Sequence, residues 1–158
     1  MNDEVITNKK NNIDIKEQNL NETDGSCAAA KKELIALEKN INKKMADANS
    51  AVKSGRTNMA MMAAASDPKD QIIKHRLEFE IKKCEALLAS RSTLITAAQR
   101  SKHNQNAACY LIKISFLRNI EHKMTTIDVE NRNNIPKAAM EKNQLYLQST
   151  KQLTSLCN

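Results

Sequence analysis

Cysteine and histidine are two of the residue types that most often bind a metal ion or act as a nucleophile with its base. The four cysteines are far apart, and none of the three histidines lies three or four positions from another histidine or a cysteine. The sequence motifs of phosphate-binding loops, dinucleotide-binding turns and hydrolases do not occur either. We therefore expect no catalytic residue, no cofactor and no metal ion, and we expect that the protein is not an enzyme.

The four cysteines, Cys27, Cys84, Cys109 and Cys157, allow two interpretations. As free and partly buried thiols they would serve as small apolar side chains. As bonded pairs they would place the protein in an oxidising compartment. In an up-down-up-down bundle the first helix starts and the last helix ends at the same pole, so a disulfide, if one forms, should join Cys27 to Cys157.

A methionine-rich segment is the first candidate for a partner-binding surface. Met59, Met61 and Met62 lie among alanines in the uncharged stretch 58–66. Methionine side chains are flexible and adapt to partners of different shapes. Core packing is the alternative role, so the sequence predicts either a packed segment or a binding surface at the tip of a helical hairpin.

The chain is basic, with 25 lysines and arginines against 18 acidic residues and a formal net charge of +7. Six residues are candidates for a basic surface: Lys43, Lys44, Lys74, Arg76, Lys82 and Lys83. Acidic residues at helical spacing, such as Glu78 before Lys82, are typical of a solvated helix face. The basic residues are spread in pairs and do not form one dense run with interleaved aromatic residues for base stacking, so binding to an acidic protein is favoured over binding to nucleic acid.

The composition predicts an all-α fold, because two glycines and two prolines cannot supply the turns of a β-protein. Residues 1–26 are rich in asparagine and hold six acidic against three basic residues, and we expect an acidic disordered tail. Residues 27–158 should form the helical bundle domain, which then carries a net charge of +10.

The first helix is expected from about residue 27 to residue 65. Its apolar residues recur at spacings of three and four: Ala30, Leu34, Leu37, Ile41, Met45, Ala48, Val52, Gly55, Met59 and Met62. This pattern is a coiled-coil-like seam with one four-four irregularity near Ile41. Asp67 and Pro68 are typical of the N-cap and first residue of a second helix, so the two helices should form a long antiparallel hairpin.

One or two further helices are expected in the second half of the sequence. The seam of the second helix reaches Ile95 and Ala98, and the polar stretch 99–106 is either a loop or a solvated part of a helix. An apolar helix should span about 107–129, and Pro136 should begin a last helix with thin core contact. The predicted fold is an irregular three- or four-helix bundle.

These patterns favour a binding function. We expect a helical protein–protein interaction module, acting as an adaptor, inhibitor or assembly factor, with self-association into a homodimer as an addition. The alternatives are a basic nucleic-acid-binding protein and a secretion-linked substrate or chaperone. The sequence has no membrane span and begins without a signal peptide, so we expect a cytoplasmic protein, with secretion or a periplasmic location as the alternative.

Overall fold

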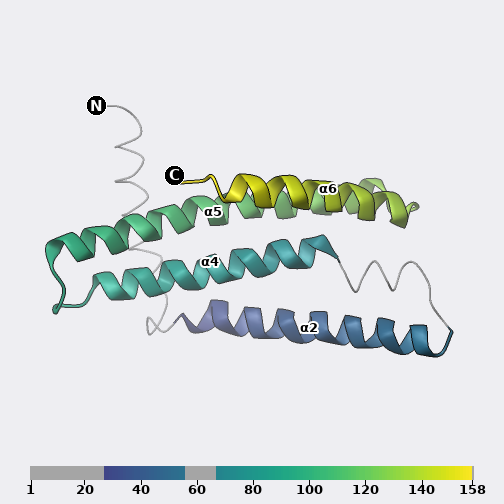
Figure 1. Ribbon diagram of the computed structural model, residues 1–158, viewed down its shortest axis with the longest axis horizontal. Coiled ribbons are helices and arrows are strands. Elements are labelled where there is room, and N and C mark those ends of the chain that lie inside the picture. The colour runs from purple at the N-terminus through teal and green to yellow at the C-terminus, as the bar shows by residue number, and fades with distance from the viewer. Residues whose placement is uncertain (1–26, 56–66, 158) are drawn as a thin grey trace.

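The computed structural model describes residues 27–55 and 67–157, which form four helices (Figure 1). They are α2 (Ala28–Lys53), α4 (Pro68–Ser90), α5 (Ala97–Glu130) and α6 (Ile135–Leu153). Successive helices run antiparallel, and these residues contain no strand, so the predicted all-α fold is confirmed. The predicted disordered tail, residues 1–26, lies outside the described residues.

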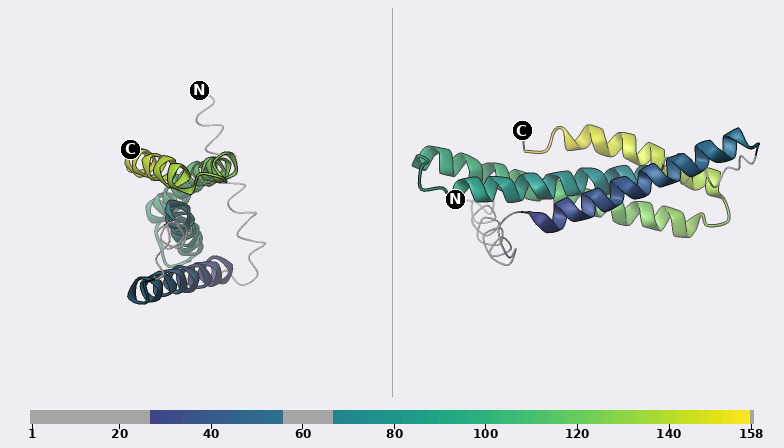
Figure 2. Two further views of the ribbon diagram at one scale, coloured as in Figure 1. Left: turned by 90° about the vertical axis from the view of Figure 1, so that its right-hand side faces the viewer. Right: turned by 90° about the horizontal axis from the view of Figure 1, so that it is seen from below.

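Helix α4 is the centre of the arrangement. It packs against α2, α5 and α6, and its contact with α5 is the most extensive in the described part of the chain. Among the described helices, α2 touches α4 alone. The end view shows α2 and α6 on opposite sides of the bundle (Figure 2). The fold is therefore a three-helix core of α4, α5 and α6, with α2 added as an outer layer.

The main core lies where α4, α5 and α6 meet. Ile72, Leu117 and Met124 have no exposed surface, and Ile120 and Leu153 complete this cluster. Full burial of one such aliphatic side chain stabilises the fold by about 1.5–3 kcal/mol. The three-helix core therefore holds together through apolar burial, whereas α2 contributes none of these residues.

The loop between α4 and α5 lies at residues 91–96, earlier than the sequence predicted. The predicted continuation of the second helix to Ala98 is therefore wrong. Residues 99–106 are helical, which was one of the two alternatives for this polar stretch. The reason is a capping box. The Thr96 hydroxyl accepts from the Gln99 backbone N–H at 3.1 Å, and the Gln99 side chain accepts from the Thr96 N–H at 2.8 Å.

Helix α2 is shorter than predicted and faces α4 with a different set of residues. It ends at Lys53, and Gly55 has a φ of 70°, which an L-residue with a side chain rarely adopts. Met45 is 49% exposed and Val52 is 51% exposed, so neither belongs to the buried seam. Lys44 continues the spacing after Ile41 instead, because its ammonium group pairs with Asp70 of α4 at 3.0 Å. The predicted four-four irregularity is therefore absent.

All four cysteines form disulfides, Cys27 with Cys84 and Cys109 with Cys157, with Cα–Cα distances of 5.8 and 5.7 Å. The interpretation as free thiols is wrong, and so is the expected pair of Cys27 and Cys157. The reason is the position of the turns. Gly55, just after α2, lies midway in sequence between Cys27 and Cys84, and the turn at 131–134 lies midway between Cys109 and Cys157.

No helix in the described ranges is long and apolar enough to cross a membrane.

Candidate interaction surface

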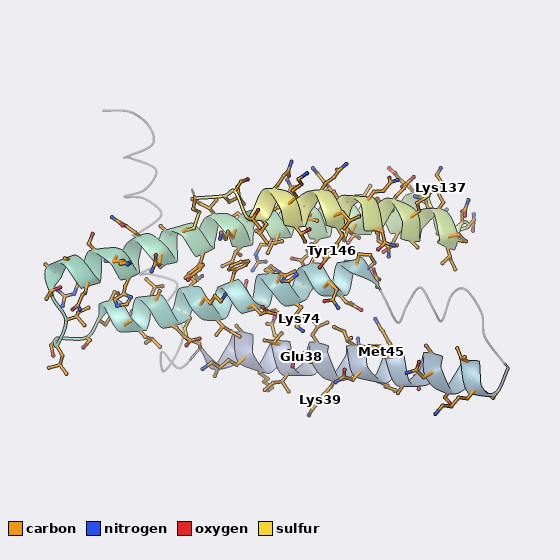
Figure 3. All side chains as sticks on the ribbon, in the orientation of Figure 1. Glu38, Lys39, Met45, Lys74, Lys137 and Tyr146 are labelled. Atoms are coloured by element: carbon orange, nitrogen blue, oxygen red, sulfur yellow. A yellow bond between two sulfur atoms is a disulfide. The ribbon has the colours of Figure 1, made fainter. Side chains whose placement is uncertain are left out.

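The six predicted basic residues do not form one patch. Lys43 and Lys82 are exposed, on different helices. Lys74 is half-buried and projects from α4 toward α2 (Figure 3). Lys44 pairs with Asp70, and Lys83 is only 8% exposed. The remaining residue, Arg76, is also engaged inside the protein.

Arg76 joins α4 to α5. Its guanidinium donates to both carboxylate oxygens of Glu121, at 2.5 and 3.2 Å, and to Glu80 at 3.3 Å. Arg118 also donates to Glu80, at 2.7 Å. Burial lowers the pKa of Arg76, but the hydrogen bonds and negative charges of Glu121 and Glu80 outweigh it, so its pKa is raised. Arg76 therefore stabilises the helix contact and is not a surface group for a partner.

Lys142 is a second internal cation, and it was not predicted from the sequence. Its ammonium group lies 2.9 Å from Asp67 at the start of α4 and 2.9 Å from Asp128 near the end of α5. Burial lowers its pKa, and the two carboxylates raise it by more. No local sequence pattern predicts the pairing of Lys142 with Asp67, because the two residues are 75 positions apart.

One flank of α2 exposes apolar residues at regular spacing. Ile35, Met45 and Val52 are 54%, 49% and 51% exposed. Together with three polar residues of the same flank, these apolar residues form a series with spacings of three and four: Ile35, Glu38, Asn42, Met45, Asn49 and Val52. We call these six residues the open seam. Among the described helices α2 contacts only α4, and α4 leaves about half of the surface of Ile35, Met45 and Val52 exposed.

The open seam has the pattern of one half of a two-helix coiled coil. Spacings of three and four correspond to the a and d positions of a heptad, with Met45 and Val52 at d and Asn42 and Asn49 at a. Asparagine at an a position costs stability but fixes the register and number of the paired helices. The flank therefore suits a specific helical partner better than a nonspecific apolar contact.

A row of lysines runs beside the open seam. Lys32, Lys39 and Lys53 are exposed and occur at multiples of seven residues, and Ala46 fills the position between them. Lys39 projects from α2 away from α4 (Figure 3). Within the described residues none of the three lysines forms an ion pair. We call these three residues the lysine row, and it gives the flank a positive edge.

The structure does not test the predicted methionine surface. Met59, Met61 and Met62 lie outside the described residues, and their role stays a prediction. Met45 and Val52 belong to the predicted apolar series that leads to Met59, at intervals of seven. The sequence thus contained the signal for the open seam, but we read Met45 and Val52 as core residues.

Among the described residues no group of histidine, cysteine, aspartate and glutamate could hold a metal ion. Comparison with known proteins assigns no relative: the chain matches no protein-family model, no curated protein and no solved structure.

Proposed function

We propose that this chain is a non-enzymatic helical interaction module that binds an acidic amphipathic helix of another protein along the open seam of α2. The observation that carries the proposal is the juxtaposition of a heptad-spaced flank with a lysine row that forms no ion pair within the described ranges. A partner helix would bury its apolar residues on Met45 and Val52 and place acidic residues beside the lysine row. An adaptor, an inhibitor or an assembly factor would each use such a surface.

The charges favour a different protein over a second copy of this chain. In a parallel pair of α2 helices, Glu38 would face its own copy across the seam. In an antiparallel pair the two lysine rows would flank each other. Like charges in these positions disfavour the pairing, so the partner should carry glutamate or aspartate there.

We also infer that the protein works in an oxidising compartment. Two disulfides in a chain of this size are rare in the reducing cytosol. This inference favours the secreted or periplasmic alternative over the cytoplasmic location that we expected. Digestion without reductant, followed by mass spectrometry, should find peptides linked through Cys27–Cys84 and Cys109–Cys157. Free thiols in protein isolated from its native source would contradict it.

Charge reversal tests the proposed partner chemistry. The probe is a labelled synthetic helix with leucine at its heptad seam and glutamate on its flanks, and a matched peptide carries lysine in place of glutamate. The wild-type protein should bind the glutamate peptide in a salt-sensitive manner. Changing Lys32, Lys39 and Lys53 to glutamate should weaken that binding by about tenfold or more and should favour the lysine peptide. An unchanged preference in fluorescence anisotropy would refute the proposal.

A further inference from the structure

Two lysines and two aromatic rings meet where α4 packs against α5. The ammonium groups of Lys82 and Lys113 lie 5.3 and 5.2 Å from the centroid of the Phe79 ring. Tyr110 stacks on Phe79, with ring centroids 5.9 Å apart. We call these four residues the aromatic–lysine cluster. The expectation that no aromatic residue accompanies the basic ones is wrong here, because Phe79 lies three residues before Lys82 and Tyr110 lies three residues before Lys113.

Two residues of the cluster, Lys82 and Tyr110, line a groove of about 300 Å³ between the two helices. The groove is lined by Lys82, Glu85, Ala86, Ala89, His103, Asn106 and Tyr110. Its volume is at the lower end of those that hold small ligands. Because α4 and α5 run antiparallel, Lys82 and Tyr110 lie at one end of the groove, and Ala89 and His103 lie at the other. A ligand could therefore place an anionic group at the lysine end and a hydrogen-bonding group near Asn106.

Lys82 and Lys113 differ from the internal cations of this protein. Lys44, Arg76 and Lys142 are all bound by carboxylates. Neither Lys82 nor Lys113 forms an ion pair with an acidic residue of the described ranges, and the predicted pairing of Lys82 with Glu78 is replaced by the contact with Phe79. Two ammonium groups around one ring repel each other. An anion that binds both would remove this repulsion.

We propose that the groove binds a nucleotide unit, with its phosphate on Lys82 and Lys113 and its base against Tyr110. Ammonium groups next to an aromatic ring are the combination by which proteins bind single-stranded nucleic acid without reading its sequence. Asn106 and His103 offer hydrogen-bonding groups to the edge of the base. The site is separate from the open seam of α2 and does not depend on the function proposed for it.

Fluorescence anisotropy with a short labelled oligothymidylate tests this site in the full-length, oxidised protein. The variant Lys82→Gln/Lys113→Gln should weaken binding about tenfold at physiological salt. It should also reduce the slope of log K against log salt by about 0.7, since the two lysines share one phosphate contact and each such contact on a single strand contributes about 0.7. Tyr110→Leu should weaken binding by about 5- to 100-fold through lost stacking. Circular dichroism checks that each variant is folded.

The matched control is Lys137→Gln/Lys151→Gln, which removes the same charge from exposed positions of α6. It should leave affinity and slope close to wild type, and an equal loss in this control would overturn the proposal. Competition identifies the source of the ligand. Displacement by thymidine monophosphate supports a free nucleotide, and resistance to it supports a strand. Equal displacement by inorganic phosphate, or ultraviolet cross-links of the oligonucleotide that avoid the peptides of Tyr110 and Lys82, would overturn the role of the base.

Discussion

Lys142 shows how one buried charge joins three helices. Its side chain is 9% exposed, and its carboxylate partners Asp67 and Asp128 keep 22% and 41% of their side-chain surface. Removing the lysine would leave both carboxylates without their cation, although water can still reach them. The cost should therefore lie below that of a fully buried ion pair.

Lys142→Met should lower the free energy of unfolding by about 1–3 kcal/mol at neutral pH. Because the folded pKa of Lys142 is raised, its contribution is fully present below the unfolded pKa of about 10.4 and is lost as the pH rises through the folded pKa. Urea unfolding at neutral and at alkaline pH should show the difference between wild type and variant becoming smaller. A difference that stays constant across that range would contradict the assignment.

The control for this change is Lys137→Met. Lys137 is exposed and projects away from the bundle (Figure 3), so its loss should change the free energy of unfolding by less than about 0.5 kcal/mol. The pair of variants separates the effect of the buried ion pair from the general effect of removing a positive charge.

For single residues, the sequence predicted contacts between near neighbours in the chain but did not predict contacts between residues that are far apart in the chain. Asp67 accepts a hydrogen bond from the Lys69 backbone N–H at 3.0 Å, as expected of an N-cap before Pro68. Lys44 pairs with Asp70, Arg76 with Glu121 and Lys142 with Asp67, at sequence separations of 26, 45 and 75 residues. No local pattern marks such pairs, because they depend on which helices become neighbours.

Helix α2 is held to the bundle by few groups. Its buried residues are Ala48 and Ala51, preceded by Cys27, whereas α6 contributes Leu153 and Lys142 to the three-helix core. The two disulfides close loops of similar length, 57 and 48 residues, each stabilising by about 4 kcal/mol in the chain-entropy model. Their loss should nevertheless have different local effects.

Cys27→Ser/Cys84→Ser should release α2, because a single helix of this length is only marginally stable without packing. Hydrogen exchange measured by mass spectrometry should show lost protection in α2 and retained protection in α4 and α5. The matched variant Cys109→Ser/Cys157→Ser should keep α6 protected, since Leu153 and Lys142 still hold it. Continued protection of α2 in the first variant, or loss of protection in the same regions in both variants, would contradict this prediction.

At the element scale, prediction succeeded where a helix start is marked by proline. The starts of α4 at Pro68 and of α6 near Pro136 were predicted, and Asp67 and Asn134 cap them. The loop at 91–96 was missed because it contains neither glycine nor proline. The sequence feature that marks the end of this loop is the capping-box pair of Thr96 and Gln99. This pair is a weak indication of a helix start when no apolar run follows it.

For the molecule as a whole, the helical class and antiparallel order followed from the composition and the proline positions. The order in which the helices pack did not follow from the sequence, because the apolar seam of α2 could equally pack against α4 alone or lie inside a closed four-helix bundle. That choice decides the function we propose. In a closed four-helix bundle Met45 and Val52 would be core residues, whereas on an outer helix they form part of a surface.

The most direct measurement compares two matched variants in binding to the glutamate-flanked peptide. Met45→Gln/Val52→Gln alters the open seam, and Met140→Gln/Leu147→Gln alters an exposed pair on α6 with the same spacing and exposures of 57% and 68%. We expect at least about a tenfold loss of affinity for the α2 variant, because two apolar contacts disappear, and wild-type affinity for the α6 variant. Equal affinities, or a larger loss for the α6 variant, would contradict the claim that α2 carries the binding surface.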